Sequence, residues 1–261
     1  MPSFFIEIKN LRGNTIMKFW KYTWLMLTMT MSLFGLSACQ DDDDYSLDKF
    51  AIEIMTVVPD GSTYYLRRDN GEKLWPFATN CPGYNFSKTR AQVNYTMLSD
   101  SIPGFSHGIK INWIENILTK KISPYLAAEN DSVYGTDPVE MLAMAIGDGY
   151  LDVRFAANFG NTGVKHLVSL IPTQADNSDP YTLEFRHQAY GDGALYAAEG
   201  LVSFDLSSLP DTKGETVDLT IKVKTFDGEK SYKLAYNSDP ACMYSEPDEI
   251  ISSDDLSKNI H

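Results

Sequence analysis

Residues 90–98 read Arg-Ala-Gln-Val-Asn-Tyr-Thr-Met-Leu, and residues 109–114 read Ile-Lys-Ile-Asn-Trp-Ile. Apolar and polar residues alternate in both stretches, which is the pattern of β-strands that pack one face on a core. Residues 50–58, 62–68 and 72–77 are three further β-rich stretches. Five short strands with tight connections predict an OB-like small barrel.

Turn signals separate these strands. Pro59-Asp60-Gly61 and Asp69-Asn70-Gly71 are typical turn sequences. Residues 114–121 fit either a helical turn or a strand, and the pattern leaves both open. We expect the barrel domain to span residues 49–123.

The second half of the chain predicts a β-sandwich, so the fold class is all-β. Residues 124–137 are rich in Pro, Gly, Asn and Asp, and we expect a linker there. Beyond it, β-rich stretches recur about every ten residues, the spacing of a sandwich. The sandwich is expected over residues 138–236, and an acidic tail over residues 237–261. Its strands are predicted at residues 139–146, 150–159, 164–171, 181–190, 201–206, 217–226 and 230–236.

The N-terminal region has the parts of a secretory signal. A basic start at residues 17–21 precedes an uncharged run from Tyr22 to Leu36, shorter than the ~20 residues that a membrane-spanning helix needs. Leu36-Ser37-Ala38-Cys39 resembles the bacterial lipobox, in which the cysteine is lipidated. We therefore expect a lipoprotein signal peptide at residues 17–38 with Cys39 as the lipidation site, and we interpret residues 1–16 as a mis-called start.

An acidic run follows Cys39. Gln40, Asp41, Asp42, Asp43 and Asp44 resemble the signal that sends some lipoproteins to the cell surface. Alternatively, the run is a solvated spacer, since like charges repel and keep a chain extended. We expect residues 39–48 to tether the protein to the outer membrane, at the cell surface or on the periplasmic face.

The net charge of −13 limits the partners. Nucleic acids are excluded as main partners because they bind through clustered Lys and Arg. Besides Cys39 the chain holds only Cys81 and Cys242, which either pair in an oxidising envelope or remain two single thiols.

Several of these stretches together resemble the NigD-like lipoprotein family. In the first half they are residues 90–98, 109–112 and 117–120; in the second half they are residues 147–151, 165–167, 183–187 and 202–206. The resemblance covers nearly all of the chain after Cys39. It implies an OB-like barrel followed by a β-sandwich on a lipid anchor, and it brings no catalytic residue or reaction.

Aromatic residues gather around the Cys81-Pro82-Gly83 loop. Side chains of this kind interleaved with amides suit stacking on a sugar or peptide, or they close the end of a small barrel. The candidate ligand-binding residues are Trp75, Phe77, Tyr84 and Phe86.

His166 and His187 fall on predicted sandwich strands, while Asp148 and Asp192 fall in Gly-Asp-Gly turns. Neighbouring strands could bring the two imidazoles and a carboxylate together as a metal site. The alternative is a pair of half-buried histidines that hydrogen-bond within the sheet.

No catalytic constellation stands out. Gly104-Phe105-Ser106-His107-Gly108 fits the nucleophile-elbow pattern G-x-S-x-G, but a strand is predicted after Ser106 where an elbow needs a helix. We expect a non-enzymatic module, without a cofactor, that binds an unidentified protein or glycan. The alternatives are an envelope hydrolase with a metal at His166 and His187, or a structural component of an outer-membrane machine.

Overall fold

The computed structural model describes residues 47, 49–160, 163–176 and 178–239. The predictions for Cys39, Gln40, Asp41 to Asp44 and Cys242 lie outside these residues. Within the described part, no helix has the length and apolar character needed to cross a membrane.

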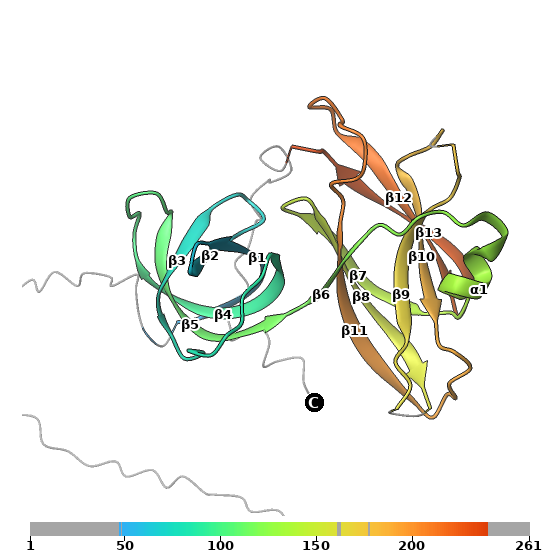
Figure 1. The fold of residues 1–261 in the computed structure, drawn as a ribbon, viewed down its shortest axis with the longest axis horizontal. Coiled ribbons are helices and arrows are strands. Elements are labelled where there is room, and N and C mark those ends of the chain that lie inside the picture. The colour runs from blue at the N-terminus through green and yellow to red at the C-terminus, as the bar shows by residue number, and fades with distance from the viewer. Residues whose placement is uncertain (1–46, 48, 161–162, 177, 240–261) are drawn as a thin grey trace, which may run out of the picture. The chain divides into compact units, whose positions relative to one another are not determined.

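The first half of the chain forms a closed five-stranded barrel, as the alternating patterns predict (Figure 1). The strand order is β1-β2-β3-β5-β4, with β3 and β5 parallel and the other pairs antiparallel. The strands are β1 (Ala51–Asp60), β2 (Thr63–Arg67), β3 (Lys73–Thr79), β4 (Thr89–Ser99) and β5 (His107–Asn116).

Alternate side chains of these strands fill the barrel, because successive residues of a strand point to opposite faces. The buried apolar residues are Met55, Val57, Tyr64, Leu66, Leu74, Ala91, Val93, Tyr95, Ile109 and Ile111. The opposite face of β4 is polar, yet Arg90, Asn94 and Thr96 on it are also buried. The alternation predicts the strand correctly but does not reveal this second burial.

The second half is a sandwich of two four-stranded sheets, as predicted (Figure 1). One sheet has the order β13-β12-β10-β9 and the other β6-β11-β8-β7. The strands are β6 (Leu118–Lys121), β7 (Glu140–Gly147), β8 (Tyr150–Phe159), β9 (Leu167–Pro172), β10 (Thr182–Gln188), β11 (Tyr196–Asp205), β12 (Val217–Thr225) and β13 (Gly228–Tyr236). Leu151, Phe185, Phe204 and Ile221 are among the apolar side chains buried between the sheets.

Residues 118–121, which the sequence left open between helix and strand, form β6. This strand pairs in parallel with β11, so it belongs to the sandwich although only Ile117 separates it from β5. Residues 124–137, where we expected a linker, hold the short helices η1 (Ala127–Glu129) and α1 (Asn130–Tyr134). Asn130 and Tyr134 of α1 are buried, so this segment packs on the sandwich.

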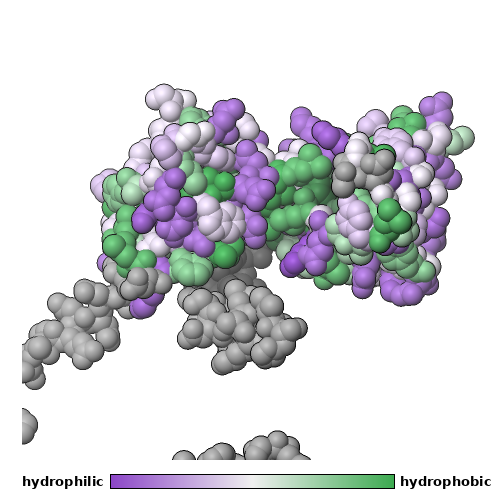
Figure 2. Space-filling model, turned by 90° about the horizontal axis from the view of Figure 1, so that it is seen from below, coloured by the Kyte–Doolittle hydropathy of each residue, from purple (hydrophilic) through white to green (hydrophobic). Residues whose placement is uncertain are grey.

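The surface of the described residues has both hydrophilic and hydrophobic areas. Figure 2 shows hydrophobic patches among a largely hydrophilic surface. An open groove of about 610 Å³ lies between the edge strands β7 and β13, where the two sheets part. Its apolar lining comes mainly from Met141, Met144, Ile146, Tyr232 and Leu234.

Candidate functional site

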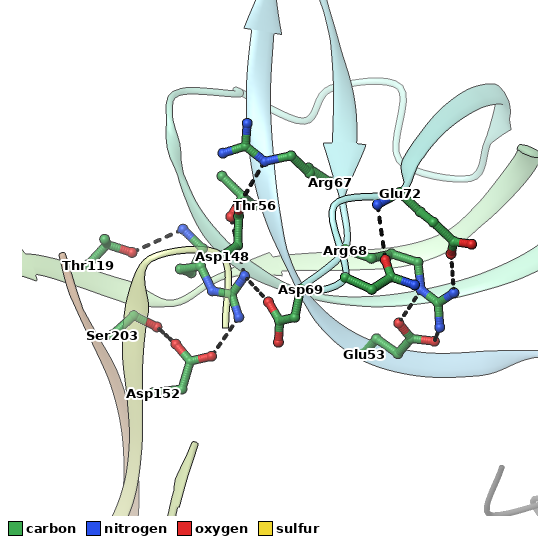
Figure 3. A network of polar contacts seen from close by, with 12 residues as sticks. Glu53, Thr56, Arg67, Arg68, Asp69, Glu72, Thr119, Asp148, Asp152 and Ser203 are labelled. Atoms are coloured by element: carbon green, nitrogen blue, oxygen red, sulfur yellow. Dashed lines mark hydrogen bonds and ion pairs between the residues drawn. The ribbon is translucent and has the colours of Figure 1, made fainter. Parts of the chain in front are cut away.

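A buried arginine joins the barrel to the sandwich, and its partners Thr56, Asp69 and Asp152 are labelled in Figure 3. Arg90 on β4 has no exposed surface, and its Nη2 lies 2.6 Å from Asp152 Oδ2 on β8. Its Nη1 lies 2.8 Å from Asp69 Oδ1 and donates to Thr56 Oγ1 at 3.2 Å. Asp152 also accepts a hydrogen bond from Ser203. Each charge of this network therefore has partners, as a buried ion pair requires.

The charges in this network act on one another. Burial alone would lower the pKa of Arg90, but the carboxylates of Asp152 and Asp69 raise it overall. Burial raises the pKa of Asp69 in spite of the neighbouring guanidinium of Arg90. Asp148, one of the metal candidates, lies in a second ion pair: its Oδ1 is 2.8 Å from Arg67 Nε. The network links strands of the barrel to strands of the sandwich. In it the carboxylates of Asp69, Asp148 and Asp152 each form an ion pair with an arginine.

The four aromatic candidates divide into two groups. Tyr84 and Phe86 pack on Tyr64 of the barrel core, with ring centroids 5.4 and 5.0 Å away. Tyr84 also donates a hydrogen bond to Asn116, and burial, followed by the charge of Tyr64, raises the pKa of Tyr84 to about 12. These two rings therefore close the barrel, which is the structural alternative that the sequence left open.

Trp75 and Phe77 lie instead on the outer face of the barrel. Trp75 packs on Phe105 of the β4–β5 loop at 4.9 Å, and Phe105 also contacts Tyr65 of β2 at 5.7 Å. The Lys73 ammonium stands 5.7 Å from the centre of the Tyr65 ring. We call Tyr65, Trp75 and Phe105 the aromatic face.

Phe77 and a hollow flank the aromatic face. Phe77 is 56% exposed, and its ring lies on Gly108, where a Cβ atom would come within 2.1 Å of it. The hollow, of about 410 Å³, includes Lys73, Gly104 and Phe105 in its lining. Outward rings, an ammonium group and an adjoining hollow are features that suit a ligand with flat apolar and polar faces.

Two histidines and one aspartate meet at an end of the sandwich. His166 Nδ1 lies 2.9 Å from His187 Nε2, and His166 Nε2 lies 3.3 Å from Asp192 Oδ2. The Phe159 ring stacks on His166 at 4.1 Å. The side chains of His166 and Asp192 are 5% and 3% exposed, and His187 is buried as well.

This arrangement is a hydrogen-bonded chain rather than a chelate. Asp192 and His187 approach different nitrogens of the His166 ring, so their donor atoms do not converge on one point as metal ligands must. Asp148, the fourth metal candidate, pairs with Arg67 and does not join them. Among the described residues, no group of three or more His, Cys, Asp or Glu side chains has an arrangement that could hold a metal ion.

The G-x-S-x-G segment is a loop between two strands. Ile102 and Phe105 form a bridge, Ser106 N donates to Lys73 O at 2.8 Å, and β5 begins at His107. No helix follows Ser106, so the segment lacks the geometry of a nucleophile elbow. Cys81 is a free thiol whose Sγ lies 3.9 Å from Asn112 O.

Family models match both halves of the chain. A model described as the NigD-like N-terminal OB domain matches residues 54–117. A model described as the NigD-like C-terminal beta sandwich domain matches residues 121–236. The comparison with curated proteins gives no match.

Solved structures resemble the chain over most of its length. A proposed toxin-related protein from Parabacteroides distasonis is 52% identical, with a TM-score of 0.69 over 74% of this chain and 96% of that one. A NigD-like immunity protein from Bacteroides caccae is 21% identical, with a TM-score of 0.56 over 72% and 98%. A proposed lipoprotein from Bacteroides fragilis is 13% identical, with a TM-score of 0.55 over 73% and 99%. The last two likenesses concern the fold alone.

Proposed function

We propose that this protein, which belongs to the NigD-like family, is a lipid-anchored module of the outer membrane that binds a carbohydrate through its barrel. The lipobox-like stretch ending at Cys39 supports the anchor, and the acidic run from Asp41 to Asp44 supports display at the cell surface. More than one acyl chain is needed for lasting attachment, which is what lipoprotein processing of Cys39 would supply.

The observation that carries the binding role is the aromatic face. Tyr65, Trp75 and Phe105 come from β2, β3 and the β4–β5 loop, and the strand 2–3 face with the flanking loops is where OB barrels bind oligosaccharides and oligonucleotides. The net charge of −13 disfavours the nucleic acid. Sugar rings therefore match the chemistry of this surface best, because their C–H faces stack on aromatic rings while hydroxyls reach Lys73.

A binding screen tests this proposal. Residues 39–261 are applied to an array of bacterial and host glycans, and the affinity of each positive glycan is measured by calorimetry. Trp75→Ala should weaken binding by about 1–3 kcal/mol, the loss typical of a stacking aromatic residue. Phe226→Ala is the matched control, because Phe226 is 50% exposed at the β12–β13 turn. Equal losses in both variants, or no glycan bound, would refute the carbohydrate role.

The location is tested separately in intact cells. Protease shaving should remove the wild-type protein and spare a variant in which Asp41 to Asp44 are alanines, if the acidic run is an export signal. Cys39→Ala should release the protein from the membrane fraction. Protection of the wild type would place the protein on the periplasmic face.

A second candidate function is protection against a protein toxin. It is favoured by the 52% identical relative, which is described as toxin-related, and by the name of the immunity protein with the same fold. Survival of sensitive cells that express this chain, challenged with toxins from related bacteria, tests it. The two functions separate cleanly, because protection should not depend on Trp75 if the aromatic face serves a sugar.

A further inference from the structure

The chain of Asp192, His166 and His187 ties together loops that are far apart in the sequence. Asp192 lies in the β10–β11 connection, His166 in the β8–β9 connection, and His187 near the end of β10. Asp192 Oδ2 also accepts a hydrogen bond from Gly160 N at 2.8 Å, directly after β8. One carboxylate therefore fixes the start of one loop and the middle of the other.

The hydrogen-bond pattern fixes where the protons must be. The Asp192 carboxylate accepts a hydrogen bond, so His166 carries its proton on Nε2. Nδ1 of neutral His166 is then an acceptor, and His187 must donate from its own Nε2. His187 Nδ1 is buried and makes no hydrogen bond of regular geometry, although backbone groups of Asp137 and Pro138 lie near the ring. The chain of hydrogen bonds is complete when both imidazoles are neutral.

The chain can hold one added proton but not two. A proton on His166 Nδ1 leaves His166 paired with Asp192, and neutral His187 can accept that N–H at its Nε2 if its own proton moves to Nδ1. A second proton, on His187, would set two N–H groups and two buried positive charges against each other across the 2.9 Å contact. Adjacent buried charges of like sign are costly, so protonation of His187 breaks the chain.

The same chain holds an exposed loop in a constrained conformation. The backbones of Gly160 and Gly193 approach so closely that a Cβ on Gly160 would lie 2.4 Å from Gly193 N. Leu195 N donates to Phe159 O at 2.9 Å. Tyr190 has a φ of 54°, a region that non-glycine residues rarely adopt. Tyr190 and Leu195 are nevertheless 60% and 82% exposed, so their own packing does not hold the loop in place.

We propose that Asp192, His166 and His187 form a protonation-sensitive latch, which holds residues 189–195 on the end of β8 at neutral pH and releases them on acidification. The latch controls whether the apolar side chains of this loop are presented in a fixed arrangement. It does not depend on the carbohydrate site, which lies on the barrel.

The charges around His187 set the direction of the response. Burial, and then the charge of His166, lower the pKa of His187, while Asp137 opposes the shift from the segment before β7. The Asp137 carboxylate itself accepts a hydrogen bond from Ala189 N at 2.7 Å.

The other charged groups of this region do not face the His187 ring. Arg186 and Glu184 pair on the opposite face of β10, where Arg186 also binds Asp131 of α1. Lys165, beside His166, is exposed.

The direction of the pH effect on stability follows from the linkage between proton binding and folding. In the unfolded chain His187 binds a proton near its ordinary pKa of 6.5, whereas the folded protein resists that proton. Stability from the latch is therefore fully present above about pH 6.5 and is lost as the pH falls through the lower pKa of the folded state. Release is an event of acidification only.

Hydrogen–deuterium exchange of residues 39–261 at pH 7.5 and 5.5, corrected for intrinsic exchange rates, tests the latch. In the wild type, protection of peptides from residues 189–195 should fall by about tenfold at pH 5.5. This pH lies one unit below the ordinary histidine pKa of 6.5, and one unit changes a protonation equilibrium about tenfold. Peptides from β4 and β5 should keep their protection. Unchanged protection of the loop between the two pH values would overturn the proposal.

Two variants assign the response to His187. His187→Phe removes the titrating ring beside Phe155 and keeps the Asp192–His166 contact, so its loop should stay protected at both pH values. His107→Gln is the matched control, a histidine of the barrel that contacts Ser99 O, and it should respond like the wild type. A His187→Phe loop that still opens at pH 5.5 contradicts the assignment.

An NMR titration of the wild type covers the case in which His187→Phe fails to fold. The imidazole signals of His187 should titrate below pH 6.5, together with the amide signal of Leu195. Titration of His187 at or above 6.5, or without a change at Leu195, would overturn the latch.

Discussion

Replacing Arg90 by methionine should uncouple the barrel from the sandwich. The substitution keeps an unbranched side chain of similar length but removes the guanidinium that contacts Asp152 and Asp69. Asp152 would then remain a buried charge beside Asp69, with Ser203 as its remaining hydrogen-bond donor. Removing one partner of a buried ion pair costs about 3–5 kcal/mol, and we expect a loss of unfolding free energy in that range.

Arg154→Met is the matched control. Arg154 lies on the same strand as Asp152, but its side chain is 59% exposed and that of its partner Glu199 is 53% exposed. An exposed pair contributes about 0–1 kcal/mol, because water and salt screen it. The two variants remove the same chemical group and differ mainly in burial.

Urea denaturation followed by two probes provides the assay. Trp75 and Trp113 are the only tryptophans after Cys39, and both lie on barrel strands, so fluorescence reports on the barrel while circular dichroism reports on all strands. The two curves should coincide in the wild type and separate in Arg90→Met, with the midpoint of thermal unfolding lowered by roughly 6–20 °C. A loss equal to that of Arg154→Met would refute the reasoning. Asp152→Leu added to Arg90→Met should restore part of the stability, since fewer buried charges then lack a partner.

Glycine substitutions give two further predictions, both measured by urea denaturation. Gly200→Ala should cost about 1–3 kcal/mol, because its Cβ would lie 2.7 Å from the buried Phe155 ring. Gly108→Ala should cost less, because the exposed Phe77 ring can turn away and the other close atom, Ser99 Oγ at 2.8 Å, ends a short side chain that can rotate. The reverse order would show that Phe77 or Ser99 is held rigidly. Gly149→Ala should cost about 1–2 kcal/mol, since Gly149 has a φ of 81° in open space, and a neutral result would mean that the β7–β8 turn can relax.

The sequence predicts the all-β class and both architectures because alternation is a local property of each strand. It does not predict the burial of Arg90, since the polar face of β4 has the same pattern whether it faces water or a second domain. The local signal is that the alternate positions of β4 from Arg90 to Thr96 are all polar and begin with an arginine.

For the candidate sites, too, nearness in the sequence does not predict which side chains meet in the structure. Residues near one another in the sequence, such as Trp75 and Tyr84, face different sides of the barrel, whereas Tyr65 and Phe105 join Trp75 from separate segments. His166, His187 and Asp192 do meet, because β9 and β10 are antiparallel neighbours and the turn after β10 returns to them. Asp148 fails to join because its turn lies beside Arg67.

The early position of β6 also affects how the protein is made. A polypeptide emerges from its amino end, so residues 118–121 leave the ribosome, and any export channel, before their partner β11 exists. During this interval β6 is an unpaired strand attached to the barrel by Ile117, and such edges recruit wrong partners. Lys120 and Lys121 give this short strand positive charge, which discourages pairing with another copy of itself. The sandwich can complete itself only when residues 196–205 have arrived, so its assembly is among the last steps of biogenesis.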